Sequence, residues 1–172
     1  MMMIQPKSSL EREAWEINNP ALSSYLLWLA TVDGFKKSHG PIHPSKLFCI
    51  FPFLYYADTR VSLAKTRSGL QSYLSKFSSS QVCKSDIPLS IHNRITMQKA
   101  KTLDALILAF DSGILILDSE TGLITPNLQV KPISQSSSND SIKELEKCAK
   151  KLGGWFSVLS NRDLARVLKV VF

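Results

Sequence analysis

Apolar residues recur every three or four positions along most of this chain, which is the spacing of an amphipathic helix. The clearest start is Asn19 followed by Pro20. An Asn side chain accepts from free backbone amides, and proline loses no hydrogen bond at the first helical position. This pattern predicts a helix from Pro20 to about Phe35. Further helices are expected at 10–17, at Leu47–Leu54 with a kink or split at Pro52, at Asp58–Leu63 with Asp58 as its cap, and at Gly69–Phe77.

The stretch Leu89–Phe110 is also helical in pattern, but a lysine interrupts its apolar stripe. If the helical spacing of this stripe is extended toward the N-terminus, the next position on the same helix side is Lys99. Either this lysine snorkels, or two helices meet near Lys101 and Thr102 caps the second. We expect the break. The stripe consists of Leu103, Leu106, Ile107 and Phe110.

A β-hairpin is expected next, because two short apolar runs flank a group of turn residues. The runs are Ile114–Leu117 and Leu123–Thr125, and the turn covers 118–122. A helix followed by a hairpin is also the order in which a winged helix-turn-helix ends. Residues 58–126 fit that module, although periodicity alone does not establish it.

The C-terminal third is expected to be a separate element. Residues 127–140 are rich in serine and contain Pro132, which is typical of a flexible linker. Ser141 or Asp140 is expected to cap a helix that runs through Leu152 and stops at Gly153 and Gly154. Ser160 with Asp163 is expected to cap a last short helix. The predicted fold is mainly α with a small β-hairpin. It comprises a helical body with a winged-helix-like module (1–126), a flexible linker (127–140) and a C-terminal helical interaction tail (141–172).

The composition indicates the net charge of the protein and the cellular compartment in which we expect it. The formal charge of +7 and the pI near 9.4 favour contact with an acidic partner, either nucleic acid or an acidic protein surface. No apolar run reaches the roughly 18 residues that cross a bilayer, and no secretion signal is recognisable at the start. We therefore expect a cytoplasmic protein without a membrane span.

Each candidate catalytic or ligand-binding motif in the sequence lacks residues that its chemistry requires. Lys101 and Thr102 resemble the end of a phosphate-binding loop, but Ala100 stands where that loop needs a glycine. His39 and His43 are separated by residues that prevent a regular helix, and no further ligands complete a metal site. Three acids lie around the predicted hairpin turn, where solvated carboxylates are usual. They are Asp111, Asp118 and Glu120. We expect no catalytic residue, cofactor or metal.

Two groups of residues are candidates for partner contacts instead. On a single helix Arg94, Gln98 and Lys101 would lie opposite the apolar stripe and form a basic face for an acidic partner or for DNA, unless that face is merely solvated. Trp155 and Phe156 follow the two glycines, so they either close the core or anchor a partner. We expect the anchor, with the pair lying outside this chain's own core.

The order of several short motifs resembles the middle component of bacterial three-component ABC systems of the Lamassu type. The motifs are Asn18-Asn19-Pro20, Phe48–Phe53 with Pro52, Thr59-Arg60, Ser68-Gly69-Leu70, Asn93-Arg94, Lys101–Leu106, the hairpin, and Leu152–Phe156. Gly154 stands where the family pattern has a basic residue. The resemblance implies a non-catalytic subunit that joins an SMC-like ABC ATPase to an effector, such as a nuclease, in an anti-phage or anti-plasmid complex.

Within that implied complex, Arg60 is a further candidate for a polar contact with a partner. The rival hypothesis is a stand-alone winged-helix DNA-binding regulator, which is supported by the charge and by the helix-hairpin order. An ATPase gene beside an effector gene would favour the bridging subunit.

Overall fold

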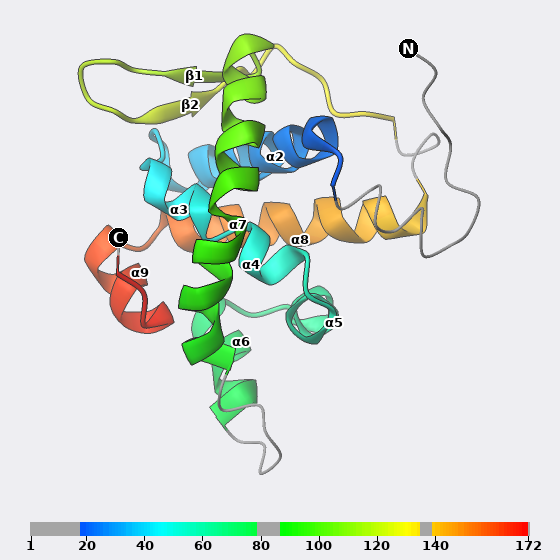
Figure 1. Cartoon of the computed structure of the whole chain (residues 1–172), viewed down its shortest axis with the longest axis vertical. Coiled ribbons are helices and arrows are strands. Elements are labelled where there is room, and N and C mark those ends of the chain that lie inside the picture. Colours follow the sequence, from blue (N-terminus) through cyan, green and yellow to red (C-terminus); the bar gives the residue numbers. More distant parts are fainter. Residues whose placement is uncertain (1–17, 79–86, 135–138, 172) are drawn as a thin grey trace.

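The computed structural model describes residues 18–78, 87–134 and 139–171, and within them the chain is mostly helical with one antiparallel hairpin (Figure 1). This confirms the predicted fold class. The expected helix at 10–17 lies outside the described residues. The elements are α2 (Pro20–Ser38), α3 (Pro44–Phe48), α4 (Phe51–Leu54), α5 (Ala57–Lys65), α6 (Leu70–Ser78), α7 (Ile87–Asp111), β1 (Leu115–Leu117), β2 (Ile124–Pro126), α8 (Asp140–Ser157) and α9 (Asn161–Leu168).

Helix α2 begins as predicted and runs one turn further than predicted. The side chain of Asn19 accepts from the amides of Ala21 and Leu22, and Pro20 takes the first helical position. The helix ends at Ser38, and His39 follows with a φ of 53°. Residues 26–30 are all buried, so α2 is enclosed by other elements rather than resting on them with one face.

Helices α2 and α8 lie side by side and cross closely at two glycines (Figure 1). A Cβ added to Gly153 would lie 2.6 Å from the Cα of Ala30, and one added to Gly34 would lie 3.0 Å from the Gly153 carbonyl oxygen. The prediction that Gly153 and Gly154 end the helix is wrong, because α8 continues to Ser157. Gly153 serves the close packing of α8 on α2 instead of helix termination.

Pro52 splits its segment as predicted, into the short helices α3 and α4. Helix α6 also matches its predicted span. The predicted cap of the next helix is wrong, because α5 begins after Tyr56 and no side chain caps it. Asp58 lies in the first turn of α5, and its carboxylate is paired with Arg94.

Helix α7 is continuous, so the predicted break near Lys101 is wrong. Thr102 is buried inside the helix, where its hydroxyl donates to the carbonyl of Gln98 at 3.0 Å instead of capping a new helix. The face of α7 that packs on α2 carries small residues, and Ser24 Oγ donates to the carbonyl of Ala105 at 2.8 Å. Close packing of these two helices therefore determines which face of α7 is buried.

The hairpin has the predicted turn and is attached to the body. Gly122 adopts a φ of 69°, which suits glycine, and the Asp118 carboxylate accepts from the Glu120 amide and the Thr121 hydroxyl. Leu115 lies opposite Pro126 in the antiparallel register. Ile42 exchanges two backbone hydrogen bonds with Ile124, at 2.8 and 2.9 Å, and so ties β2 to the segment before α3.

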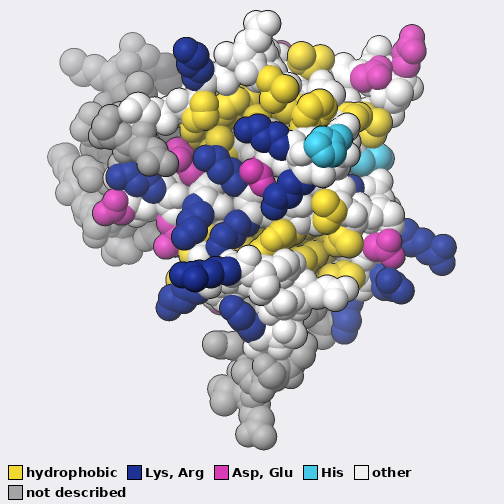
Figure 2. Space-filling view, turned by 180° about the vertical axis from the view of Figure 1, so that it is seen from behind, with side chains coloured by type: hydrophobic (Ala, Val, Ile, Leu, Met, Phe, Trp, Pro, Cys, Tyr) yellow, Lys and Arg dark blue, Asp and Glu magenta, His cyan; other side chains and the backbone are white. Residues whose placement is uncertain are grey.

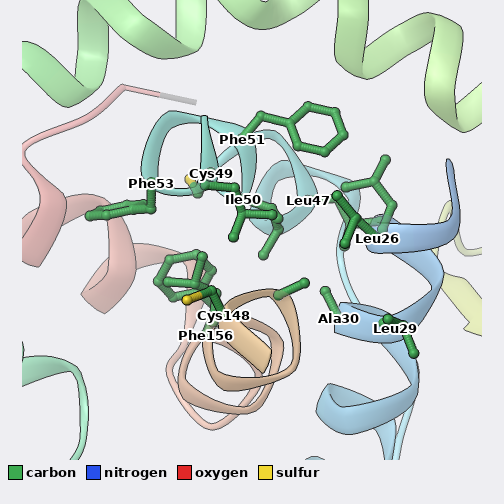
Figure 3. Close-up of a cluster of buried hydrophobic side chains, with 14 of the residues drawn as sticks. Leu26, Leu29, Ala30, Leu47, Cys49, Ile50, Phe51, Phe53, Cys148 and Phe156 are labelled. Carbon is green, nitrogen blue, oxygen red and sulfur yellow. The ribbon is translucent and has the colours of Figure 1, made fainter. Parts of the chain in front are cut away.

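The C-terminal third belongs to the same hydrophobic core as the rest of the described chain. Before α8, the Trp28 indole donates to the Asn127 carbonyl, and the Ile133 amide donates to the Tyr25 hydroxyl. Figure 3 shows Cys148 and Phe156 of α8 in one buried cluster with residues of α2, α3 and α4. The described residues of the predicted tail therefore pack on this chain.

Candidate partner-binding surfaces

Arg94 links α7 to α5 within the chain and does not belong to an exposed basic face. Its guanidinium pairs with the Asp58 carboxylate, and its carbon Cζ lies 4.0 Å from the centre of the Tyr56 ring. Its side chain is only 12% exposed. Burial acts to raise the pKa of Asp58, but the hydrogen bond and charge of Arg94 outweigh it and hold that pKa below the ordinary value.

Lys101 and Gln98 lie on the same inward side of α7. The Lys101 ammonium is 4.4 Å from the centre of the Tyr55 ring and 3.3 Å from the side-chain oxygen of Asn18. Burial lowers its pKa. Gln98 is half-buried one turn earlier. The predicted exposed basic face of Arg94, Gln98 and Lys101 is therefore wrong, because two of its members hold α7 against residues of the chain itself.

Arg60 joins α5 to α8. Its Nε donates to the Glu144 carboxylate at 3.1 Å, and Nη1 donates to the Leu54 carbonyl at the same distance. The side chain is 19% exposed. Its described contacts are therefore within this chain.

Trp155 and Phe156 are core residues. Phe156 is 1% exposed and packs against Phe53, with 6.0 Å between the ring centres, while Trp155 is 9% exposed and lies equally far from Tyr73. The expectation that this pair lies outside the core is wrong. Both residues are still inside α8, so no pliable corner precedes them.

A different surface carries exposed apolar residues. On α7, Leu103 and Ile107 are 42% and 56% exposed on the helix side that faces away from α2. Strand β1 packs against α7 and exposes two aliphatic side chains of its own. We call this region the α7–hairpin surface. Its apolar residues are Leu103, Ile107, Leu108, Ile116 and Leu117.

The charged residues that border the α7–hairpin surface are acidic except for Lys99, which is exposed one turn before Leu103 on α7. Between Lys101 and Lys131 the sequence contains no lysine or arginine, although the whole chain has a formal charge of +7. This run without basic residues is visible in the sequence, but helical periodicity predicts that the apolar stripe within it is buried. The acids are all exposed, and they are Asp104, Asp111, Asp118 and Glu120.

The described ranges 18–78, 87–134 and 139–171 contain neither a candidate metal centre nor a candidate membrane span. In those three ranges, no group of three or more His, Cys, Asp or Glu side chains is placed to hold a metal ion. His43 instead accepts from the Ser45 amide at the start of α3. Nor does any helix of the described chain have the length and apolarity required to cross a membrane.

A helical chain with exposed aliphatic side chains on one helix and its hairpin has the features of a subunit that docks onto other proteins. The family model for the ABC-three component (ABC-3C) system Middle Component 3 matches residues 7–172. The chain therefore belongs to this family, which confirms the resemblance to the middle component of three-component ABC systems. No curated protein and no solved structure matches the chain.

Proposed function

We propose that this chain is a non-catalytic bridging subunit that joins an SMC-like ABC ATPase to an effector, such as a nuclease, in a Lamassu-type anti-phage or anti-plasmid complex in the cytoplasm. Membership in a middle-component family supports the place in a multi-component system. The order of the motifs supports the Lamassu type. The α7–hairpin surface is the structural observation that carries the bridging role.

The α7–hairpin surface suits docking onto a protein. Leu103 and Ile107 are neighbours on one side of a regular helix, so a partner can bury both without rearranging the backbone. Exposed aliphatic groups of this kind gain free energy when they leave water. The acids around them, including Asp104 and Asp111, would form a polar rim that favours a basic partner surface.

Copurification with the products of neighbouring genes tests this proposal. A tagged chain carrying Leu103→Ser and Ile107→Ser should lose its partner while melting at the parental temperature, because neither residue is in the core. A matched control carries Val61→Ser and Val158→Ser, which are exposed apolar residues on other elements. The control should retain the partner. Normal recovery of the partner by the Leu103 and Ile107 variant would disprove the docking role of this surface.

The non-catalytic role is tested separately on the purified chain. We expect neither ATP hydrolysis nor plasmid cleavage in the presence of magnesium. The acid most suspect for such chemistry is Glu120, which lies in the hairpin turn beside Asp118. Activity that follows the chain through purification and vanishes on Glu120→Gln would overturn this part of the proposal.

The rival function is a stand-alone regulator with a winged-helix module at 58–126, which stays a prediction. A regulator of that kind would bind an operator sequence without a protein partner. Copurification of the chain with an ATPase and an effector favours the bridge, whereas sequence-specific DNA binding by the chain alone favours the regulator.

A further inference from the structure

Several cationic side chains converge where α8 passes the junction of α5 and α6. The Lys151 ammonium donates to the carbonyls of Leu63, Ala64 and Thr66, at 3.1, 2.9 and 2.7 Å. The Lys76 ammonium donates to the Thr66 hydroxyl at 2.8 Å. Two ammonium groups from different helices therefore meet at one threonine.

Two more cations complete this group. Arg67 is exposed and follows Thr66 directly, and Lys147 is exposed one turn before Lys151 on α8. We call Arg67, Lys76, Lys147 and Lys151 the basic corner. No carboxylate among the described residues forms an ion pair with any of the four. Their positive charge is therefore not cancelled by the described part of the chain.

The titration of Lys151 agrees with this crowding of like charges. Burial lowers the pKa of Lys151, and the nearby charges of Lys147, Lys76 and Arg67 lower it further, although Cys148 acts in the opposite direction. An anion bound at the basic corner would relieve that repulsion.

The residues around the basic corner indicate which anion it fits. The exposed positions at the start of α6 are small or polar, namely Ser68, Gly69, Gln71 and Ser72. Lysine and serine are depleted in the centre of protein interfaces, whereas Lys, Arg, Ser and Gln are common contacts to DNA phosphates. None of these residues is aromatic, so the stacking that proteins use to bind single strands is missing here.

In Figure 1, α2 and α8 lie behind α7, and Figure 2 shows the molecule from that opposite side. Lys and Arg side chains gather across the middle of that face. The α7–hairpin surface is bordered by four exposed acids and one exposed base, Lys99, so the two regions differ in charge. A polyanion would therefore be drawn to the side of α8.

We propose that the basic corner binds the phosphate backbone of double-stranded DNA without reading its sequence. Arg67, Lys76 and Lys147 supply cations that contact phosphates, and Lys151 adds charge while it caps the end of α5. This inference does not depend on the bridging role, because a chain without any protein partner would bind DNA in the same way.

Fluorescence anisotropy with a labelled DNA duplex of about 30 base pairs tests the proposal on the full chain over a salt series. The test variant carries Arg67→Glu and Lys147→Glu, neither of which has a hydrogen bond to a described residue. The control carries Lys99→Glu and Arg162→Glu, exposed residues of α7 and α9 with the same total charge change. Circular dichroism establishes that both variants are folded.

We expect the test variant to bind at least roughly tenfold more weakly in low salt, and the slope of log K against log salt to become shallower by about two. The control should retain most of its affinity. Equal losses in both variants would show that net charge alone acts, and the proposal would be wrong. Tighter binding of a single strand, of duplex RNA or of polyglutamate than of the DNA duplex would also overturn it.

Discussion

Gly153 and Gly154 are adjacent in the sequence but face different neighbours. A Cβ at Gly153 would run into the backbone of Ala30, which cannot move without displacing α2. A Cβ at Gly154 would meet the ends of the Asp33 and Lys37 side chains, which can turn away. The same added methyl group therefore has opposite consequences at the two positions.

We predict that Gly153→Ala lowers the free energy of unfolding by about 2 kcal/mol or more, as overpacking does in close-packed interiors. Gly154→Ala should be neutral or stabilising, since alanine favours a helix over glycine by roughly 1 kcal/mol. Urea unfolding followed by circular dichroism compares the two. If both variants unfold at the same urea concentration, the close crossing of α2 and α8 is wrong.

Asp58 gives the fold a pH dependence of known sign. Its pKa in the folded chain lies below the ordinary value of 3.8 because Arg94 outweighs the effect of burial. The ionised carboxylate therefore adds stability above pH 3.8, and that contribution is lost as the pH falls through the lower folded value.

We predict that Asp58→Asn destabilises the chain at neutral pH and that its difference from the parent shrinks below about pH 4. Unfolding curves at several pH values, recorded for both proteins, measure this difference. Asp104→Asn is a matched control, since Asp104 is an exposed acid on α7 with no ion pair to a described residue. A difference between Asp58→Asn and the parent that is constant over this pH range would contradict the Arg94 pairing.

At the scale of elements, α7 packs the helix side that carries polar residues against the rest of the chain. The aliphatic parts of Arg94 and Lys101 lie on this side. Their charged groups contact the Asp58 carboxylate and the Tyr55 ring, respectively. Small residues such as Ala105 let α2 approach closely. The larger Leu103 and Ile107 stay outside, where they are available to a partner.

The continuity of α7 can be tested at Ala100, an exposed position in the middle of the helix. We predict that Ala100→Gly costs roughly 1 kcal/mol of stability, because glycine loses more backbone entropy than alanine inside a helix. Lys99→Ala, one residue away, should leave stability almost unchanged, since both residues are good helix formers. Chemical denaturation measures both variants. If Ala100→Gly is as stable as the parent, residues near 100 are not inside a helix.

At the scale of the whole molecule, α8 is a central element that joins distant parts of the chain. Its glycines approach α2, Lys151 caps α5, and Phe156 packs on Phe53 of α4. The body and the predicted tail therefore depend on each other for burial of apolar area.

We predict that Phe156→Ala destabilises the isolated chain by about 3–5 kcal/mol, because it leaves a cavity where a large ring was fully buried. Val158→Ala, two residues later and 63% exposed, should have almost no effect. Thermal melts of the two variants provide the comparison. If Phe156→Ala melts at the same temperature as the parent, Phe156 is not a core residue and is again a candidate for anchoring a partner.

The sequence by itself determined the features that depend on neighbours within a few positions. Asn19 with Pro20 starts α2, Pro52 splits α3 from α4, and the turn around Gly122 makes the hairpin. Each of these depends on a local hydrogen bond or a fixed φ angle. The fold class followed from them, as did the family, through the order of short motifs.

Only the tertiary structure decided which faces of the helices are buried and which surfaces are left for partners. Periodicity placed Leu103 inside and Lys101 outside, but the packing of α2 against small residues of α7 reversed this. Gly153 was expected to end a helix because nothing local shows that Ala30 will lie against it. Burial depends on contacts between residues far apart in the chain, and the spacing along one segment does not contain that information.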